Sequence, residues 1–350
     1  MSNYLARAFP LLASRLPHMS LADLPTPVSS ARIAVGERSL DILIKHDDVT
    51  GVEYGGNKLR KLEYILQQAR DKRAQRIATF GGVGSNHAVA TALYARRLGF
   101  DCSCFLFHQS LKPGLGDALR FHMQNDTEMI AIGGDRHARV ATMRKYLHGR
   151  HAWVVPLGGS SWQGTVGYVN AALELAAQIE AGDVPCPERV YVALGTMGTA
   201  VGLALGFALA GLDTELHAIR VTQEQYSNKA AVEHLMRKTT HMMHRLDAAI
   251  PPDLAARAKW VHRNEFFAGG YGRSNAATEE AIDRARRELD LALESTYSGK
   301  TMCGLLHDYA AGVTENALFW NTYNSRPMNI DTAMPADFTH VPREFARYFD

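Results

Sequence analysis

The sequence predicts an α/β fold of parallel sheets flanked by helices. Short β-rich runs alternate with longer stretches of helical periodicity along most of the 350 residues, a pattern typical of parallel sheets covered by helices. Strands are expected at residues 42–45, 77–80, 103–107, 129–132, 152–155, 190–194 and 216–221. At roughly 100–200 residues per domain, this length corresponds to about two domains.

Helices are indicated by apolar residues that recur every three or four positions. One helix carries an apolar stripe opposite Lys and Arg side chains, formed by Leu59, Leu62, Ile65, Leu66 and Ala69. A second stripe at 92–98 stops before Gly99, a residue suited to end a helix. Small and aliphatic residues at 200–210 and an apolar run from residue 302 predict two more helices. Residues 182–187, with two prolines, are expected to form a connector, and a surface tail is expected beyond Tyr323.

Composition narrows the class of partner. Lys and Arg number 38 against 36 Asp and Glu, a net charge of +2, which argues against nucleic acid or an anionic membrane as a partner. No apolar run approaches the ~18 residues of a membrane span. The four cysteines and fifteen histidines show neither a disulfide framework nor a metal-binding spacing. We therefore expect a cytoplasmic protein with no metal and a small-molecule partner.

Three glycine-rich segments each open a helix, and the first is Gly55-Gly56-Asn57-Lys58-Leu59-Arg60-Lys61. Lys58 and Lys61 lie one turn apart on one face of the expected helix. A cationic first turn opposes the helix dipole unless an anion binds there, and lysine is the side chain that forms Schiff bases with carbonyl groups. A solvated basic helix start is the alternative interpretation.

The second segment, Gly81-Gly82-Val83-Gly84-Ser85-Asn86-His87, follows the strand expected at 77–80. A strand, a glycine turn and a helix start together form an anion site of backbone N–H groups, to which Ser85 and Asn86 add side-chain donors. Position 87 is His where a dinucleotide fingerprint needs its third glycine, which disfavours a nicotinamide dehydrogenase. A helix simply capped by Ser85 or Asn86 is the alternative.

The third segment, Gly195-Thr196-Met197-Gly198-Thr199, follows the strand expected at 190–194. Several N–H donors, two hydroxyls and the positive end of a helix suit a phosphate monoester, although a tight strand-to-helix turn is the alternative. No Lys follows the last glycine in the register of a Walker A loop. Nearer the C-terminus, Tyr271 lies between glycines, and Ser298 stands where it would cap the helix that follows.

A phosphate loop, an anion-binding Ser-Asn turn and a helix-start lysine together suit pyridoxal phosphate and an amino acid carboxylate. The segments GGNKLRKLEYIL, GGVGSNHAVATALYARRLGF, ALGTMGTAVGL, GYGRSN and TYSGKTMCGL occur in this order. They resemble the D-cysteine desulfhydrase and 1-aminocyclopropane-1-carboxylate deaminase family, from about residue 24 to about residue 306.

The resemblance implies the two-domain tryptophan-synthase-β-like fold (pyridoxal-phosphate fold type II). It implies a larger cofactor-binding domain of residues 1–57 and 170–350, a smaller inserted domain of residues 58–169, and an active site between them. It also implies pyridoxal phosphate as cofactor and a homodimer.

The resemblance further implies a role for each matching position. Lys58 matches the lysine that binds the cofactor covalently and moves the Cα proton, and Lys61 the lysine that helps hold the phosphate. Ser85 resembles the catalytic serine, and Asn86 resembles the residue that bonds the cofactor's phenolate oxygen. Ser85, Asn86 and His87 together resemble the turn that binds the substrate. The phosphate loop matches Gly195, Thr196, Met197, Gly198 and Thr199, and the two active-site tyrosines match Tyr271 and Tyr297.

Ser298 falls where the family places the partner of the pyridine nitrogen. The deaminases resemble one another in carrying Glu here, whereas the desulfhydrases carry a hydroxyl residue. A carboxylate keeps the pyridine protonated, while a hydroxyl leaves a weaker electron sink, which suits β-elimination better than cyclopropane opening. We therefore expect a carbon–sulfur lyase that converts D-cysteine to pyruvate, ammonia and hydrogen sulfide.

Three alternatives stay open. Cysteate sulfo-lyase and 1-aminocyclopropane-1-carboxylate deaminase share most of these motifs, and a pyridoxal-phosphate-binding protein without turnover is a reading from another class. Three departures from the family pattern bear on the substrate. Gly84 replaces the usual Gln, Val89 stands where an Arg is common, and Ser274-Asn275 replaces Pro-Thr.

Overall fold

The computed structural model describes residues 3–111, 114–334 and 337–349, and the chain divides into two compact units. The larger unit comprises Met1–Tyr64 and Ser160–Arg326, and the smaller comprises Ile65–Gly159 and Pro327–Asp350. These bounds differ from the expected 58–169 insertion at three places. The smaller unit begins inside the helix α3 (Lys58–Asp71), the larger resumes before α7 (Trp162–Glu180), and the C-terminal tail belongs to the smaller unit.

The larger unit is built on a six-stranded sheet, in the order β1-β2-β10-β7-β8-β9, with every described pairing parallel except β1 with β2. The expected strands at 42–45, 190–194 and 216–221 are confirmed as parts of β2, β7 and β8. The strands are β1 Val28–Val35, β2 Arg38–His46, β7 Arg189–Leu194, β8 Glu215–Arg220, β9 Trp260–Arg263 and β10 Ala317–Asn321.

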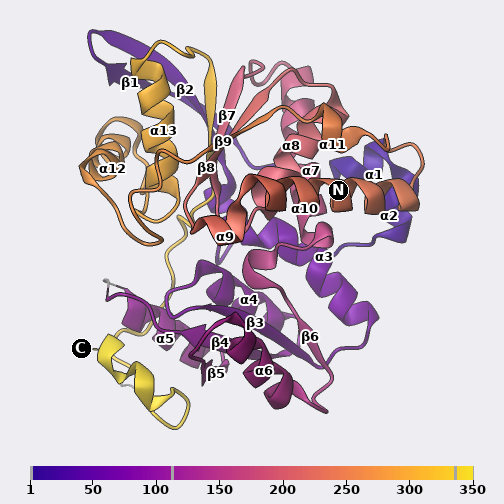
Figure 1. The fold of residues 1–350 in the computed structure, drawn as a ribbon, viewed down its shortest axis with the longest axis vertical. Coiled ribbons are helices and arrows are strands. Elements are labelled where there is room, and N and C mark those ends of the chain that lie inside the picture. Colours follow the sequence, from indigo (N-terminus) through magenta and orange to yellow (C-terminus); the bar gives the residue numbers. More distant parts are fainter. Residues whose placement is uncertain (1–2, 112–113, 335–336, 350) are drawn as a thin grey trace. The chain divides into compact units, whose positions relative to one another are not determined.

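Helices cover both faces of this sheet (Figure 1). One core contains the inner sides of α7, α8 and α10, and the other contains those of α12 and α13. The α8 helix is apolar all round, as expected for a helix buried between neighbours. The helices besides α3 and α7 are α1 Tyr4–Ala8, α2 Pro10–Arg15, α8 Gly198–Ala210, α9 Glu224–Ser227, α10 Lys229–Leu246, α11 Leu254–Arg257, α12 Ala276–Leu289 and α13 Ser298–Ala310, with a 3-10 turn, η1, at Asp47–Val49.

The smaller unit is built on a four-stranded parallel sheet, in the order β5-β4-β3-β6, with α4, α5 and α6 as its helices. All four strands match the expected ones within two residues at each end. Their bounds are β3 Arg76–Gly82, β4 Asp101–Phe107, β5 Glu128–Ala131 and β6 Ala152–Val154. The helices are α4 Asn86–Arg97, α5 Leu115–Gln124 and α6 Arg136–Leu147, with 3-10 turns η2 at Leu157–Gly159 and η3 at Arg343–Tyr348.

Three strands were missed by the sequence analysis. β1 lacks a regular alternation of polar and apolar residues, and only Ile33 and Val35 in it are buried, because it is an edge strand with one partner. It pairs antiparallel with β2 across the turn at Gly36. β9 is four residues long at the opposite edge, and β10 lies far along the chain from its partners β2 and β7. Among the described residues, no helix is both long enough and apolar enough to cross a bilayer.

Candidate active site

Lys58, the first residue of α3, connects this helix to the 195–199 loop through Asn57. The Lys58 ammonium donates to Asn57 Oδ1 at 2.6 Å, and Asn57 Nδ2 donates to Thr199 Oγ1 at 3.0 Å. Thr199 is in the first turn of α8. The structure therefore brings together the first and third glycine-rich segments.

Lys61 lies against the same loop, at the start of α8. Its side chain is 2% exposed, and a Cβ at Gly198 would lie 3.2 Å from Lys61 Nζ and 2.9 Å from Ser160 Oγ. Ser160 Oγ donates to Thr196 Oγ1 at 2.9 Å and accepts from Gly198 N at 3.2 Å. Glycine is required at 198 because any side chain there would fill the space between Ser160 and Lys61.

The residue before α8, Met197 at φ 74°, provides no side-chain cap, and among the first N–H groups of this helix that of Gly198 donates to Ser160 Oγ. The first N–H groups of a helix lack intrahelical partners and carry the positive end of the helix dipole. Together with the hydroxyls of Ser160, Thr196 and Thr199 and the Lys61 ammonium, they form a cradle of hydrogen-bond donors. This arrangement favours a phosphate group.

The two lysines are electrostatically perturbed. Burial lowers the pKa of Lys58 to about 8, although the negative charge of Glu294 opposes the change. Burial and the nearby Lys58 ammonium lower the pKa of Lys61 well below its ordinary value. A lowered pKa makes the neutral, nucleophilic amine of Lys58 accessible near neutral pH, and a bound anion would relieve the repulsion between the two ammonium groups.

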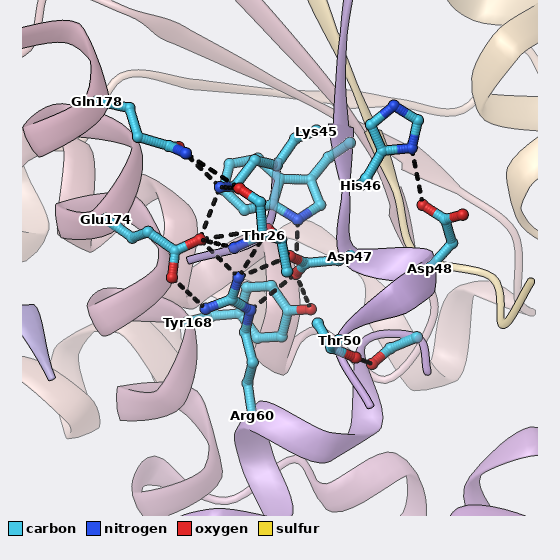
Figure 2. Close-up of polar contacts among 12 residues, drawn as sticks. Thr26, Lys45, His46, Asp47, Asp48, Thr50, Arg60, Tyr168, Glu174 and Gln178 are labelled. Atoms are coloured by element: carbon cyan, nitrogen blue, oxygen red, sulfur yellow. Dashed lines mark hydrogen bonds and ion pairs between the residues drawn. The ribbon is translucent and has the colours of Figure 1, made fainter. Parts of the chain in front are cut away.

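Arg60, between the two lysines in sequence, points into a buried cluster of charges (Figure 2). Its guanidinium forms paired hydrogen bonds with Asp47, at 3.0 and 2.7 Å, and with Glu174, at 3.0 and 2.9 Å. Lys45 Nζ donates to Glu174 Oε1 at 2.6 Å, so two buried cations balance two buried anions. Burial alone would raise the pKa of Glu174, but Arg60 and Lys45 lower it to about 2.

This buried charge cluster fixes the first turn of α3 to its neighbours. Asp47 also accepts from Tyr168 Oη at 2.7 Å and from Trp320 Nε1 at 2.8 Å, and so connects α3 with α7 and β10. The backbone of α3 approaches α7 so closely that a Cβ at Gly167 would lie 2.0 Å from Arg60 O. A side chain held in this way keeps little rotational freedom, and the same holds for the turn that carries Lys58 and Lys61.

Tyr271 and Tyr297 lie together, with their hydroxyl oxygens 2.7 Å apart. The Tyr297 ring packs over the phosphate-binding loop, since a Cβ at Gly195 would lie 3.2 Å from Tyr297 Cε1. Burial raises the pKa of Tyr297 well above its usual range. The buried Lys300 donates to the carbonyls of Phe267 and Gly270, at 2.7 and 2.8 Å, and thereby holds the loop that presents Tyr271.

Ser298 was expected to cap α13, but it is the first residue of that helix, and Tyr297 takes the cap position. Its buried hydroxyl lies 3.3 Å from Glu294 Oε1. The Glu294 carboxylate accepts from the backbone N–H groups of Thr296, Tyr297 and Ser298 at 2.7 to 2.8 Å, and so takes the place of a cap.

The second glycine-rich segment lies in the smaller unit. Ser85 is the N-cap of α4, which was the alternative interpretation of this segment, and its Oγ accepts from Ala88 N at 3.3 Å. Asn86 begins the helix, and the buried His87 shares a 2.9 Å hydrogen bond between Nε2 and Thr79 Oγ1. The helix start and its hydroxyl are therefore arranged as an anion site requires.

Sequence reasoning missed three residues that shape the larger unit's site. Ser160 follows two glycines and precedes the α7 N-cap Ser161, a strand-to-helix pattern that resembles the other three segments. Glu294 stands four residues before Ser298, the spacing at which an acid can receive the N–H groups of a helix start. Lys300 gave no signal beyond its place in a motif, because its partners are backbone carbonyls about 30 residues earlier.

Curated relatives share most of the chain's length. D-cysteine desulfhydrase of Salmonella paratyphi A is 33% identical over 308 residues, which cover 84% of this chain and 88% of the relative. D-cysteine desulfhydrase of Salmonella newport matches to the same extent.

Solved structures share the fold. The crystal structure of a homologue of 1-aminocyclopropane-1-carboxylate (ACC) deaminase superposes with a TM-score of 0.75 at 26% identity, covering 93% of this chain and 96% of that one. A hydrogen sulfide-producing enzyme from Fusobacterium nucleatum has a TM-score of 0.60 at 13% identity, with 91% of each chain covered, and shows the fold alone.

The family model described as pyridoxal-phosphate dependent enzyme matches residues 19–319, which include the cradle, both lysines and both tyrosines. With this match and relatives at 33% identity, the chain belongs to the pyridoxal-phosphate-dependent enzymes.

Proposed function

We propose that this enzyme cleaves D-cysteine and water into pyruvate, ammonia and hydrogen sulfide. The observation that carries the proposal is Lys58, whose pKa of about 8 and place beside a phosphate cradle suit a lysine bound to an aldehyde cofactor. The D-cysteine desulfhydrases at 33% identity support this choice of substrate.

The residues of the cradle fit pyridoxal phosphate. The space that a Cβ at Gly198 would fill, between Ser160 and Lys61, admits phosphate oxygens. The phosphate would be held by Lys61, the hydroxyls of Thr196 and Thr199, and the first N–H groups of α8. Lys58 would hold the aldehyde carbon, and Ser298 would face the pyridine nitrogen.

When bound, pyridoxal phosphate supplies an electron-withdrawing ring that stabilises negative charge at the substrate Cα. Lys58 Nζ accepts the proton from Cα, because an amine with a pKa near 8 is a competent base close to neutral pH. The Cβ–sulfur bond then breaks, and its electron pair leaves with the thiolate.

Tyr297 donates a proton to the departing sulfur, or does so through Tyr271. Its raised pKa keeps the hydroxyl protonated at neutral pH, and the 2.7 Å contact with Tyr271 provides a path for replacing the proton. The Tyr297 ring over Gly195 places it at the border of the cradle.

The turn at Ser85, Asn86 and His87 binds the substrate carboxylate in this proposal. Its support is the capped N-terminus of α4, where backbone N–H groups and the Ser85 hydroxyl favour an anion. Asn86 would hold the cofactor's phenolate oxygen, as the resemblance implies. Ser85 acts beside the cofactor as the family's catalytic serine.

Ser298 favours elimination of a leaving group over opening of a cyclopropane. Its hydroxyl is next to Glu294, whose charge is already stabilised by three backbone N–H groups at the start of α13. A hydroxyl rather than a carboxylate at this position leaves the cofactor ring a weaker electron sink, which is adequate when a thiolate leaves.

The test is a substrate panel on the purified holoenzyme. D-cysteine, L-cysteine, cysteate, β-chloroalanine and the cyclopropane amino acid are each supplied, and 2-oxo acid, ammonia and sulfide are measured. We expect the highest kcat/KM with D-cysteine, and pyruvate and sulfide in equal amounts. If the cyclopropane acid or cysteate were turned over faster, that compound and not D-cysteine would be the substrate.

Two lysine variants control this test. Lys58→Ala removes the proposed base and is expected to abolish both turnover and the visible absorbance of the bound cofactor. Lys72→Ala, at an exposed lysine that directly follows α3, is expected to leave both unchanged. Visible absorbance without product from any member of the panel would point to a binding protein without turnover.

We also propose a cytoplasmic homodimer. The support is the family resemblance together with four cysteines that form no disulfide among the described residues, two of them buried on β4. Light scattering on the purified holoenzyme is expected to give twice the 38.6 kDa chain mass. A monomeric mass would contradict this proposal.

A further inference from the structure

Gln109, just after β4, occupies the space above the glycine turn that precedes Ser85. Its Oε1 accepts from Gly84 N at 3.2 Å. A Cβ at Gly82 would lie 2.3 Å from that oxygen, and a Cβ at Gly84 would lie 2.5 Å from Leu115 Cδ2. A side chain at position 82 would therefore displace the Gln109 amide, and one at position 84 would displace the Leu115 side chain.

Gln109 is held in turn by the C-terminal tail. Tyr348 Oη donates to Gln109 O at 3.0 Å and accepts from Gln109 N at 3.1 Å, so one hydroxyl satisfies both backbone groups of this residue. Arg347 Nη2 donates to the same hydroxyl at 2.9 Å. Tyr348 is buried, with 5% of its surface exposed, although only two residues follow it in the sequence.

The tail is anchored on the smaller unit by apolar contacts as well. Val341 and Phe345 are 1% and 0% exposed, and the Phe345 ring meets the His108 ring edge to face at 5.2 Å between centroids. A Cβ at Gly116, in α5, would lie 2.5 Å from Tyr348 O, so the start of α5 admits the tail only with glycine there. The segment Val341–Phe349, named here the tail anchor, is thus a packed part of the unit.

These contacts form one path from the tail anchor to the turn at 82–85. The turn is closed by a 2.9 Å hydrogen bond from Ser85 N to Gly82 O, and it sets the direction of the N–H groups that begin α4. A binding site whose donors are already fixed loses less free energy on binding than one that must be ordered. The direction of these donors therefore depends on Gln109 and, through it, on Tyr348.

We propose that Gln109 and Tyr348 are positioning residues that set the affinity of the Ser85–His87 turn for the carboxylate of a small amino acid. The inference rests on the proposed function for the role of that turn. The path from Tyr348 to Gly84 lies wholly within the smaller unit.

The test compares Gln109→Leu, Tyr348→Phe and the double variant with the wild-type holoenzyme. KM and kcat with D-cysteine, the visible absorbance, and amide hydrogen exchange of the peptide spanning 81–89 are measured. Loss of one hydrogen bond to a site of this kind weakens binding by about five- to tenfold. We expect KM to rise by that factor with kcat and absorbance nearly unchanged, and exchange at 81–89 to quicken. The double variant is expected to match Gln109→Leu, because the two residues act in series.

Two further variants keep the test decisive. Tyr146→Phe, which loses an exposed 3.3 Å hydrogen bond from Arg150 in the same unit, is expected to behave as wild type. Gln109→Glu keeps an acceptor for Gly84 N and is expected to retain slow exchange at 81–89, which separates loss of this contact from misfolding.

Unchanged exchange at 81–89 in Gln109→Leu and Tyr348→Phe would overturn the inference, and so would quickened exchange with unchanged KM. Failure of the proposed function is distinguishable, because wild-type enzyme would then give no product from D-cysteine. In that case KM is replaced by the concentration of D-cysteine that half-maximally slows exchange at 81–89, with the same predicted order of variants.

Discussion

Arg60 offers the sharpest test of how the active-site helix is held. Replacing Arg60 with Met leaves the Asp47 and Glu174 carboxylates buried with only Lys45 to balance them. Removal of one partner from a buried ion pair costs about 3–5 kcal/mol, because a charge is left without compensation in a poorly solvated place. The free energy of unfolding of the larger unit is expected to fall by this amount.

The assay is urea unfolding followed by tryptophan fluorescence, which includes Trp320 inside the buried charge cluster. At a slope of about 3 kcal/mol per M, the transition midpoint is expected to fall by more than about 1 M. Arg70→Met, at the exposed end of the same helix, serves as the matched control and is expected to shift the midpoint only slightly.

A double variant tests whether the charges of Asp47 and Arg60 are coupled. Asp47→Asn combined with Arg60→Met restores the balance of one cation and one anion, so its loss is expected to be smaller than the sum of the single losses by about 1–3 kcal/mol. A loss below about 1 kcal/mol for Arg60→Met, or strict additivity in the double variant, would refute the account of the cluster.

Three more predictions follow from the same geometry. Between about pH 6 and about pH 3, the wild-type protein is expected to lose about 2 kcal/mol more stability than Glu174→Gln. The folded pKa of Glu174, about 2, lies below its ordinary value, so the carboxylate stabilises the fold above about pH 4.5 and loses this contribution as the pH falls. Equal shifts of the urea midpoint in the two proteins would contradict this. Lys300→Met removes two hydrogen bonds from a charged donor, worth about 2 kcal/mol or more, and is expected to quicken amide exchange in the loop that presents Tyr271. Glu294→Gln removes the charge that raises the pKa of Lys58, so the pH midpoint for reaction of the apoprotein with pyridoxal phosphate, followed by absorbance, is expected to fall below about 8.

The local part of the site could be predicted from the sequence. Glycine turns that open a helix could be recognised in the sequence, and this identified the segments of Lys58, Ser85 and Thr196, of which the last two also follow a strand. The chemistry of the residue types then suggested a phosphate, a carboxylate and an aldehyde. The assignment to a family rested on the same segments taken together.

The long-range part of the site was not readable. Arg60 stands in a run of basic residues and is typical of a solvated helix start by pattern, yet it is fully buried because Asp47 and Glu174, 13 and 114 residues away in sequence, neutralise it. The tail beyond Tyr323 was expected to follow the surface, but its sequence did not show that Phe345 and Tyr348 are buried within the smaller unit. Both outcomes depend on partners that periodicity does not identify.

The central claim is that Lys58, and not Lys61, carries the cofactor. Reduction of the holoenzyme with borohydride, followed by proteolysis and mass spectrometry, locates the attached group directly. With a pKa of about 8, Lys58 is about 10% neutral at pH 7, enough to react, whereas Lys61 is placed for the phosphate. The account predicts one cofactor per chain, on Lys58. A cofactor on Lys61, or none on the 55–61 segment, would contradict it.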